Sequence, residues 1–406
     1  MTAQNVRTPT ARGVGRGRRR ASALVIGSAV GLLLLAGCSQ EAEPTPSVSS
    51  QAGAFRIGLE APLTGAQSEL GQGMLRGAQL AADKLNTNGG VLGNQVSIVP
   101  IDDAADPATG TAAAKAAVEG IDAVVGPYNS GVGLATLPIY LDAGLVPMRL
   151  TSADNTAGLG FTLQPMTSQI APTAGAALGD WLKAKSVAII YDDTADYTQQ
   201  AATALQGDLR ARGVDVSAFI PITAGQATYD DALARAAATN PAVTYLATYY
   251  PEAAVLAKGL AAANSPSTCV ADYSAFDNGF ISNAGVDVAQ RCDVLGVPAP
   301  GDFSGSAEAM ANFQEAFGEP PNVWSPYTYD SVMLLADAVN RVGSADAAVL
   351  TPVLEVTEGW SGWTGPVAFE TPSGNRLPSQ VVVLEVGADG AFTVNKDWAQ
   401  ASGFTF

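Results

Sequence analysis

Histidine is absent from this chain of 406 residues, and both cysteine and basic residues are scarce. Without an imidazole the chain cannot form a Ser-His-Asp triad, a Cys-His dyad or a histidine-ligated metal site. The 21 Lys and Arg residues stand against 38 Asp and Glu residues, which gives a formal net charge of −17. Such an excess of negative charge argues against nucleic acid and anionic lipid as partners. The 47% hydrophobic composition, in contrast, is ample for buried cores, and the length allows two domains.

Residues 1–37 have the layout of a lipoprotein signal peptide. They carry six arginines and no acidic residue, followed by an apolar run of 16 residues at 21–36. The run ends in the letters LAGC, residues 35–38, which resemble a bacterial lipobox. We therefore expect Cys38 to be acylated and to attach the mature protein to the cell membrane on its extracytoplasmic side. The alternative, an uncleaved membrane anchor, needs about 20 apolar residues. The arginine pair at residues 19 and 20 leaves the export route open, either Sec or twin-arginine.

The mature chain is more acidic than the whole, because the signal holds six of the 21 basic residues and none of the 38 acidic ones. This leaves 15 basic residues and a formal charge of −23. Residues 38–53 have no apolar periodicity and are rich in Pro, Ser and Glu. This composition predicts a flexible tether between the lipid and the folded part.

Cys269 and Cys292 are the only cysteines besides Cys38. Because two thiols in an exported protein more often pair than stay free, they are predicted to form a disulfide. The bridge would close a loop of about 23 residues and stabilise the fold by roughly 3 kcal/mol in the chain-entropy model. The alternative is a pair of unrelated buried thiols.

From Phe55 onward, strand-like and helix-like segments alternate. Strand patterns occur at 55–59, 96–101, 121–125, 146–148, 187–191, 214–219, 243–247 and, as the last one, 381–386. Helical patterns occur at 75–85, 107–118, 132–142, 171–184, 197–212, 230–238, 252–263, 307–317 and 329–342. Such alternation predicts parallel sheets with helices on both faces. The two series predict an α/β protein with two Rossmann-like lobes, and the seam falls near residues 162–165.

The segment VVGPYNSGVGLAT, residues 124–136, follows a predicted strand and leads into a predicted helix. Ligands of open parallel sheets bind at this edge, and the first N–H groups of a helix attract an anion. The segment lacks the Lys-Ser or Lys-Thr of a phosphate loop and the third glycine of a dinucleotide fingerprint. Asn129 and Ser130 therefore suit a small carboxylate. The alternative is that Ser130 only caps its helix.

A second polar turn, Thr151-Ser152-Ala153-Asp154-Asn155, follows the next predicted strand. Two polar turns at neighbouring strand ends of one lobe can converge on a single small molecule. The same residue types are also favoured as helix caps, so both interpretations stay open.

The chain also contains an ordered series of longer stretches: IGLEAPLTGAQSELGQGMLRGAQLAADKLNTNGGVLGNQVSIVPIDDAADP, VVGPYNS with LATLPIY, VAIIYDD with DYTQQ, ITAGQATYDDALARA and TYLATYYPEA. This series resembles the branched-chain amino acid binding proteins of ABC transporters, which have the type I periplasmic binding protein fold. The resemblance extends from Phe55 to the C terminus. It implies two lobes joined by three crossing strands, with residues 54–163 and about 302–377 in the first lobe and 164–301 and about 378–406 in the second.

The resemblance also implies a function. Such a protein is a monomer that captures a small zwitterionic ligand, a branched-chain amino acid by default, and delivers it to an ABC permease. It implies no catalytic residue, no metal and no cofactor. An amide-like or urea-like ligand, or a role as a sensor subunit of the same fold, are the alternatives.

Carried over position by position, the resemblance assigns ligand contacts. Ser130 matches the serine that holds the α-carboxylate. The turn of residues 151–155 matches a segment that contacts carboxylate and amino group, with Asp154 in place of a threonine. Tyr197 and Tyr249 match cleft tyrosines, and Leu70 replaces an aromatic residue near the cleft mouth.

Two departures from the family pattern affect the chemistry. In the family, an acidic residue faces the ligand ammonium. The matching position in this chain is occupied by Tyr273, and Asp272 is adjacent to it. We therefore hypothesise that Asp154, or failing that Asp272, pairs the ammonium, because a buried charge needs compensation. The disulfide of the family's first lobe would join positions that are Ala105 and Asn129 in this chain, so it is absent.

An exported hydrolase with paired carboxylates is the competing class of function. Its candidates are the doublets Asp102-Asp103 and Asp192-Asp193. Adjacent residues point in different directions, so neither doublet makes a facing acid/base pair by itself. Aspartates at strand ends also cap the helices that follow them.

Overall fold

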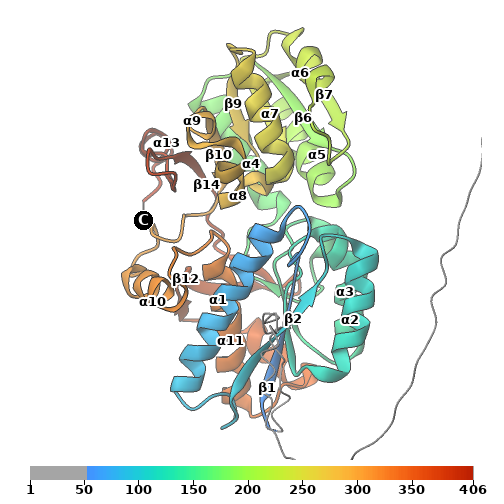
Figure 1. The fold of residues 1–406 in the computed structure, drawn as a ribbon, viewed down its shortest axis with the longest axis vertical. Coiled ribbons are helices and arrows are strands. Elements are labelled where there is room, and N and C mark those ends of the chain that lie inside the picture. Colours follow the sequence, from blue (N-terminus) through green and yellow to red (C-terminus); the bar gives the residue numbers. More distant parts are fainter. Residues whose placement is uncertain (1–52, 406) are drawn as a thin grey trace, which may run out of the picture. The chain divides into compact units, whose positions relative to one another are not determined.

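The computed structural model describes residues 53–405 (Figure 1). The predicted signal peptide, the lipidated Cys38 and the tether up to residue 52 lie outside the described residues, so these remain predictions. The described part has two lobes, each built around one sheet.

The first lobe, called the N-lobe, contains a sheet with the strand order β11-β12-β13-β5-β4-β3-β1-β2. Its strands are β1 (Phe55–Ala61), β2 (Val96–Asp102), β3 (Ala123–Val125), β4 (Pro147–Arg149), β5 (Phe161–Thr162), β11 (Trp360–Gly362), β12 (Gly365–Glu370) and β13 (Asn375–Leu377). Its helices are α1 (Ser68–Thr87), α2 (Pro107–Ala117), α3 (Ser130–Asp142), α10 (Ala307–Phe317), α11 (Ser325–Val342) and α12 (Ala347–Glu355). The pairs formed among β1 to β5 are parallel, whereas β12 pairs antiparallel with β11 and β13.

The second lobe, called the C-lobe, contains a sheet with the order β15-β14-β10-β9-β8-β6-β7. Its strands are β6 (Ser186–Asp192), β7 (Asp215–Ile222), β8 (Val243–Ala247), β9 (Thr268–Ala271), β10 (Cys292–Gly296), β14 (Val382–Val386) and β15 (Phe392–Val394). Its helices are α4 (Thr167–Ala176), α5 (Asp196–Ala211), α6 (Asp230–Ala237), α7 (Tyr250–Ala262), α8 (Asn278–Ala284), α9 (Val286–Ala289) and α13 (Lys396–Ser402). Only the pairs that involve β14 are antiparallel.

The sequence forms these layers because strands and helices carry different apolar patterns. All five residues of β8 are buried, as expected for a parallel strand with helices on both faces. In α1 the buried side chains lie on one stripe of the helix, which includes Leu70, Met74, Ala78 and Leu85. The stripe packs on the N-lobe core, and α1 lies against α11.

The chain passes between the two sheets three times, after β5, after β10 and after β13. Both lobes therefore contain segments that are distant in the sequence. The predicted fold class is confirmed: two α/β lobes with mostly parallel sheets and three crossing segments.

The prediction that residues 381–386 form the last strand is wrong, because β15 follows and pairs with β14. The short strands β5, β9, β10 and β11 to β13 were also not predicted from the sequence. Each has only two to six residues. A segment of that length gives too few alternations to reveal a period.

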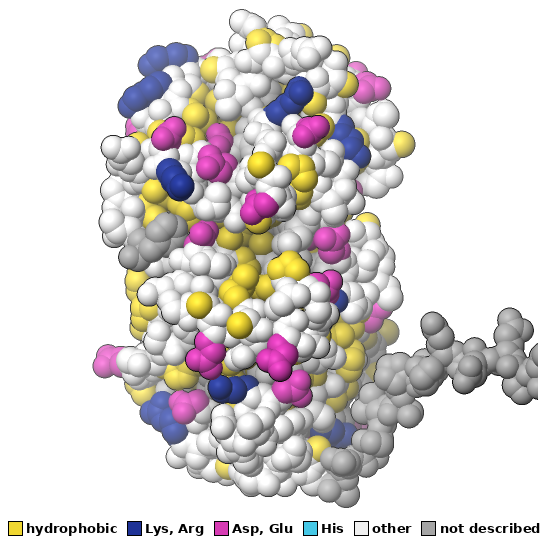
Figure 2. All heavy atoms as spheres, turned by 60° about the vertical axis from the view of Figure 1, so that its left-hand side comes forward, with side chains coloured by type: hydrophobic (Ala, Val, Ile, Leu, Met, Phe, Trp, Pro, Cys, Tyr) yellow, Lys and Arg dark blue, Asp and Glu magenta, His cyan; other side chains and the backbone are white. Residues whose placement is uncertain are grey.

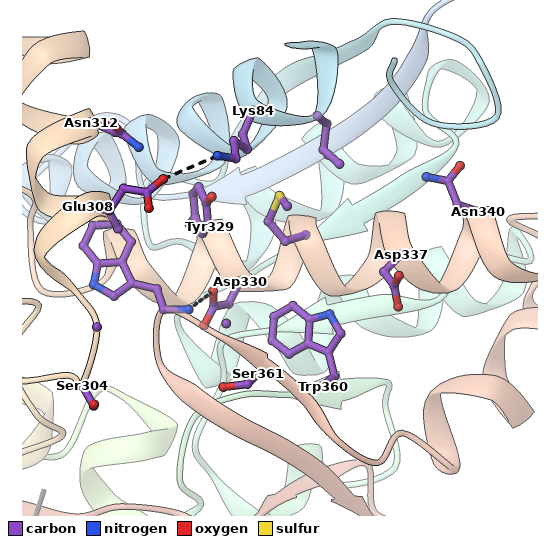
Figure 3. Close-up of a pocket in the computed structure, with 16 residues that line it drawn as sticks. Lys84, Ser304, Glu308, Asn312, Tyr329, Asp330, Asp337, Asn340, Trp360 and Ser361 are labelled. Carbon is purple, nitrogen blue, oxygen red and sulfur yellow. Dashed lines mark hydrogen bonds and ion pairs between the residues drawn. The ribbon is translucent and has the colours of Figure 1, made fainter. Parts of the chain in front are cut away.

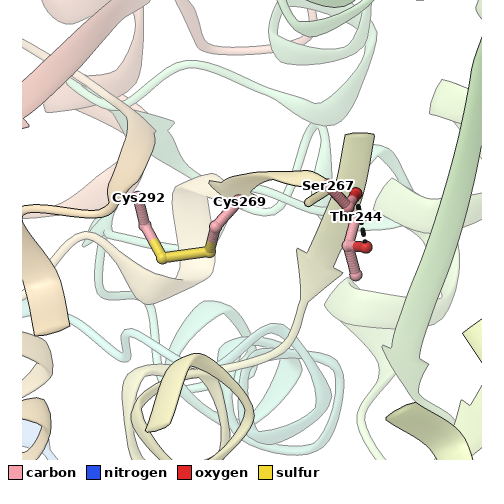
Figure 4. Close-up of a disulfide and its surroundings, with 4 residues drawn as sticks. All are labelled: Thr244, Ser267, Cys269 and Cys292. Atoms are coloured by element: carbon pink, nitrogen blue, oxygen red, sulfur yellow. Dashed lines mark hydrogen bonds between the residues drawn. A yellow bond between two sulfur atoms is a disulfide. The ribbon is translucent and has the colours of Figure 1, made fainter. Parts of the chain in front are cut away.

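A disulfide joins Cys269 and Cys292, which lie opposite each other on the neighbouring parallel strands β9 and β10 (Figure 4). The interpretation as two unrelated thiols is therefore wrong. Next to the bridge, the hydroxyls of Thr244 and Ser267 share a hydrogen bond of 2.9 Å between β8 and the start of β9.

No helix within residues 53–405 is both long enough and apolar enough to cross a membrane. The same residues contain no group of three or more His, Cys, Asp or Glu side chains placed to hold a metal ion.

Candidate ligand-binding cleft

The turn predicted to hold a carboxylate lies at the carboxyl end of β3 and leads into α3. Gly126 has a φ of +101°, and a Cβ there would lie 2.0 Å from the carbonyl oxygen of Glu60, so only glycine fits. Asn129 occupies the N-cap position without a side-chain cap bond, and Ser130 is the first helical residue. The Ser130 hydroxyl accepts a hydrogen bond from the Ala153 N–H at 3.1 Å. Ser130 therefore does not simply cap its helix, but ties the two polar turns together.

The second turn is buried against the first. The Ser152 hydroxyl donates to Gln164 Oε1 at 3.1 Å, and its carbonyl accepts from the Thr167 N–H at 2.7 Å. Thr151 and Ala153 are fully buried beside it. The structure thus brings both predicted turns to one wall of a cavity, and that wall belongs to the N-lobe.

A buried arginine lies behind this wall. Arg149, at the end of β4, is 0% exposed. Its guanidinium donates to the Thr151 carbonyl at 3.1 Å and to Asn375 Oδ1 at 2.6 Å, both of which are neutral groups. Burial lowers the pKa of Arg149 to about 9, so the side chain stays charged at neutral pH. The N-lobe wall therefore carries a positive charge that no carboxylate of the described residues pairs.

Five aromatic side chains, which we call the aromatic cluster, contact one another in a closed ring, and the four tyrosines among them line the same cavity. The cluster consists of Tyr128 and Trp324 from the N-lobe and Tyr197, Tyr249 and Tyr273 from the C-lobe. Neighbouring ring centroids are 5.3 to 6.4 Å apart. All five side chains are buried. The cluster therefore encloses the space from both lobes.

Gln164 connects the two lobes at the first crossing segment. Its Oε1 accepts from the Ser152 hydroxyl of the N-lobe and from the Tyr273 hydroxyl of the C-lobe at 3.2 Å. Its Nε2 has no partner, although the residue is fully buried. A donor group therefore remains available at the point where the lobes meet.

The cavity enclosed by these groups is small, about 10 Å³, which is room for about one water molecule. Among the predicted site residues, those that line it are Ser130, Ser152, Tyr197, Tyr249 and Tyr273. The lining residues that were not predicted are Tyr128, Leu150, Gln164 and Ser274. Gln164 had a visible signal, since it is a polar residue in the apolar stretch FTLQP at the predicted seam.

Buried polar atoms without a partner gather around this cavity. They are Gln164 Nε2 and the Tyr197 hydroxyl, which belong to residues that line it. Leaving a buried polar group unsatisfied costs about 1–3 kcal/mol. A polar ligand group in the cavity would supply the missing hydrogen bonds.

Asp272 lies one layer behind the C-lobe wall. Its carboxylate accepts from the Tyr245 hydroxyl at 2.6 Å and from the N–H and hydroxyl of Ser274, which lines the cavity. No Lys or Arg of residues 53–405 forms an ion pair with it. Burial first, and the Asp272 charge second, raise the pKa of the Tyr197 hydroxyl well above its usual value, so this group stays protonated.

Of the other predicted contacts, Asn129, Thr151, Ala153 and Asp272 are sequence neighbours of lining residues but do not line the cavity themselves. Asp154 and Leu70 do not line it either, for the following reasons. Asp154 is exposed, and its carboxylate accepts from the Ser168 N–H at 3.1 Å and hydroxyl at 2.9 Å, because it sits beside the start of α4. Leu70 is fully buried in the N-lobe core, because it belongs to the apolar stripe of α1. The expectations that Asp154 pairs an ammonium and that Leu70 lies at the cleft mouth are corrected by these positions.

The aspartate doublets of the hydrolase alternative do not form facing pairs. Asp102 is half-buried and accepts from the N–H groups of Leu63 and Thr64, whereas Asp103 is fully buried. Asp192 Oδ1 accepts from the N–H and hydroxyl of Thr194, as strand-end aspartates commonly do.

The lobes contact each other directly around the cavity. The Tyr250 hydroxyl donates to the Ala66 carbonyl at 2.9 Å, and Asn155 Nδ2 donates to Asp196 Oδ2 at 3.0 Å. Apolar side chains are also visible where the two lobes meet on the face in Figure 2. The cleft is therefore closed over the cavity in this structure.

A more spacious cavity of about 470 Å³ lies on the N-lobe between α1, α10, α11 and β11 (Figure 3). Its charged groups have partners: Lys84 pairs with Glu308 at 3.7 Å, and Asp330 accepts from the Trp363 N–H at 2.8 Å. None of its lining residues carries a buried polar atom without a partner. Its size alone does not make it the ligand site.

The comparisons with known proteins agree with this geometry. A family model described as periplasmic binding protein matches residues 54–391. The Leu/Ile/Val-binding protein homolog 2 of Brucella abortus is 27% identical over 348 residues, which cover 83% of this chain and 92% of the relative.

Two solved structures with bound ligands share the fold. The substrate-binding protein LivJ of Streptococcus pneumoniae, in complex with isoleucine, has a TM-score of 0.76 and 21% identity and covers 84% of this chain and 99% of its own. A solute-binding protein of R. palustris, in complex with benzoate, has a TM-score of 0.75 and 22% identity and covers 84% and 95%.

Proposed function

Because the chain belongs to the periplasmic binding protein family, we propose that it is an extracytoplasmic solute-binding protein that captures a small amino acid between its lobes and delivers it to an ABC permease. The relative in Brucella abortus is named for Leu, Ile and Val, and the neighbour from Streptococcus pneumoniae holds isoleucine. A branched-chain amino acid is thus the default ligand of the family.

The unpartnered polar atoms of the cleft carry the proposal. Gln164 Nε2 and the Tyr197 hydroxyl are donors without a partner, and the Ser130 hydroxyl already accepts one bond and can still donate. A cluster of buried donors suits an acceptor group with several lone pairs, such as a carboxylate. Arg149 behind the same wall adds a positive charge that attracts an anion.

The C-lobe supplies a negative charge near the cavity. Asp272 is buried behind Tyr273 and Ser274 and hydrogen-bonds only to neutral groups among the described residues. A buried charge is costly unless it is compensated. We therefore assign the ammonium end of the ligand to the C-lobe side of the cavity, where Asp272 attracts it. A zwitterion between the lobes would compensate Arg149 and Asp272 together.

Binding requires the lobes to move apart. The enclosed cavity has room for about one water molecule, which is far less than an amino acid needs. We propose hinge motion about the three crossing segments, with the ligand stabilising the closed arrangement.

An aromatic carboxylate is the second candidate. The aromatic cluster favours it, and the neighbour from R. palustris binds benzoate. Asp272 separates the two candidates, because benzoate has no ammonium to compensate its charge.

Isothermal titration calorimetry on residues 54–406 tests the proposal with leucine, isoleucine, valine and benzoate. Asp272→Asn should weaken amino acid binding by about tenfold or more and leave benzoate binding unchanged or stronger. If neither an amino acid nor benzoate binds to the wild-type protein, the proposed function is wrong.

The membrane anchor is part of the proposal and has its own test. In cells that express the full chain, Cys38→Ser should move the protein from the membrane fraction to the soluble extracytoplasmic fraction. Cys269→Ser serves as the control, because it removes a different cysteine and should leave the protein on the membrane. Retention of the Cys38→Ser protein on the membrane would contradict the lipoprotein assignment.

A further inference from the structure

A second chamber adjoins the small cavity on the outer side of the cleft. It measures about 360 Å³ and is lined by both lobes. Tyr249 lines both spaces, and the neighbouring residues Ser130 and Asn129 line the inner and the outer space respectively. We call the larger space the outer chamber. A ligand held at Ser130 therefore has the outer chamber beside it, and the chamber is large enough for an extended aliphatic chain.

Every charged residue that lines the outer chamber is acidic. Asp192, Asp196 and Glu252 all come from the C-lobe, whereas the N-lobe side, with Gln67 and Pro107, contributes no charge. Asp192 is 2% exposed and Glu252 is 8% exposed. Two of the three carboxylates are thus held out of bulk water and close to one another.

Only neutral donors satisfy these carboxylates. Asp192 accepts from Thr194, Asp196 from Asn155 Nδ2 at 3.0 Å, and Glu252 from the Gly225 N–H at 3.1 Å. None of the three takes part in an ion pair of the described residues. Burial first, and repulsion by Asp192 among the further causes, raise the pKa of Glu252. The chamber therefore holds negative charge for which the protein provides no cation.

An independent observation points to the same kind of ligand. Asn129 is 6% exposed and lines the outer chamber, and its Oδ1 has no hydrogen-bond partner. Its Nδ2 is already used, since it donates to Gln67 Oε1 at 3.0 Å. The group that is missing next to Asn129 Oδ1 is consequently a donor. An ammonium or guanidinium group is a donor and a cation at once.

We propose that the outer chamber receives a cationic group that the ligand carries at a distance from its carboxylate, so that basic amino acids are preferred over branched-chain ones. This inference rests on the proposed function, because it assumes that the carboxylate is held at Ser130. It replaces the family's default ligand by a class with a second positive charge, represented by lysine and ornithine.

Lysine and norleucine provide the sharpest comparison, because they have the same aliphatic chain and differ in the terminal ammonium. Calorimetry on wild-type residues 54–406 should give an affinity for lysine at least about tenfold higher than for norleucine, as expected for a charge-assisted hydrogen bond between partly buried groups.

Two variants test whether the carboxylates of the outer chamber cause the preference for lysine over norleucine. Glu252→Gln and Asp192→Asn should each weaken lysine binding by about tenfold and change norleucine binding by less than about twofold. Both should fold at least as well as the wild type, because each removes a buried like charge. Asp215→Asn, which removes an exposed carboxylate at the start of β7, is the matched control and should change neither affinity.

The outcomes separate the inference from the function on which it rests. If leucine or norleucine binds as tightly as lysine, or if both variants keep the wild-type preference, the inference is wrong and the proposed function stands. If no amino acid binds, the inference is wrong, and if benzoate does not bind either, the proposed function is wrong as well. The wild-type comparison alone decides the question should a variant fail to fold.

Discussion

Two buried tyrosines of the C-lobe show how single residues divide between ligand binding and stability. The Tyr197 hydroxyl lines the cavity and has no partner, whereas the Tyr245 hydroxyl donates to Asp272 Oδ1 at 2.6 Å. Both side chains are almost fully buried. Their hydroxyls therefore differ only in whether the protein itself satisfies them.

We expect Tyr197→Phe to weaken amino acid binding by about fivefold to tenfold without lowering the free energy of unfolding, because the hydroxyl makes no bond in the ligand-free protein. Tyr245→Phe is the matched control. It should lower the free energy of unfolding by about 1–3 kcal/mol, because Asp272 Oδ1 loses the hydrogen bond from the Tyr245 hydroxyl. Calorimetry and urea unfolding measure the two effects. A Tyr197→Phe protein with unchanged affinity would remove Tyr197 from the binding site.

A buried carboxyl pair in the N-lobe makes stability depend on pH. Glu60 and Asp103 are both 0% exposed, and neither Glu60 Oε1 nor Asp103 Oδ2 has a partner. Burial, together with the charges of Asp102 and Asp106, raises the pKa of Asp103 to about 7 against the hydrogen bond from the Ala105 N–H. In the unfolded chain this pKa is about 3.9. Between these two values the folded state binds more protons than the unfolded state, so stability falls as pH rises.

Asp103→Asn removes this loss of stability and keeps a side-chain oxygen that can accept the hydrogen bond from the Ala105 N–H. The variant should match the wild type near pH 4 and exceed it at pH 8 by on the order of 3 kcal/mol in the free energy of unfolding. Urea unfolding across this range measures the difference. Asp106→Asn, on an exposed N-cap of α2, should give a much smaller gain at pH 8, because the Asp106 charge is the last of the causes that raise the pKa of Asp103. Parallel pH profiles for Asp103→Asn and wild type would contradict the assignment.

The sequence predicted part of the cavity wall and missed the rest for a physical reason. Ser130 and Ser152 stand in polar turns at strand ends, a local pattern that is visible in the chain. Tyr128 and Trp324 come from segments almost 200 residues apart, and their contact at 5.3 Å exists only after the N-lobe has assembled. The prediction that Asp154 pairs the ligand ammonium failed, because a match to a family position does not determine the direction in which a side chain points.

At the scale of elements, length alone did not decide what could be predicted, since β3 and β4 have three residues each and were predicted. The parallel strands β6 and β8 were found because a buried strand with helices on both faces is a continuous apolar run. The strands β11 and β13 have three residues each and are held by pairing with β12, so their sequence carries no period of its own.

Glycines on helices test how closely the elements pack. A Cβ at Gly77 of α1 would lie 2.2 Å from the Ser325 carbonyl oxygen of α11. Gly77→Ala should therefore lower the free energy of unfolding by about 1–3 kcal/mol, because α1 and α11 must separate. A Cβ added at Gly207 of α5 would meet no atom within 4 Å, so Gly207→Ala should raise the free energy of unfolding by about 0.5–1 kcal/mol. Urea unfolding of both variants separates the effect of the close contact between α1 and α11 from the effect of helix propensity. If both variants changed the free energy of unfolding in the same direction, the explanation by a close contact would be contradicted.

At the scale of the whole molecule, ligand binding and lobe closure are one equilibrium. The residues that close the cleft and the residues that line the cavity are partly different sets: Tyr250 joins the lobes through the Ala66 carbonyl but does not line the cavity. A change at Tyr250 can therefore alter closure without altering a ligand contact. If the closed state becomes less stable, a smaller fraction of the molecules is closed. The apparent affinity for the ligand then falls in proportion to that fraction.

Tyr250→Phe keeps the aromatic ring and removes the cross-lobe hydrogen bond. The closed state should lose about 1 kcal/mol, which corresponds to roughly a fivefold weaker apparent affinity for whichever amino acid binds the wild type. Small-angle scattering should show a larger radius for the ligand-free variant and the wild-type radius at saturating ligand. Tyr191→Phe is the control, because Tyr191 packs on Phe219 inside the C-lobe sheet, with ring centroids 4.4 Å apart, and should change neither quantity. If Tyr250→Phe left both radius and affinity unchanged, the hydrogen bonds between the lobes would not govern closure, and the aromatic cluster would have to hold the lobes together alone.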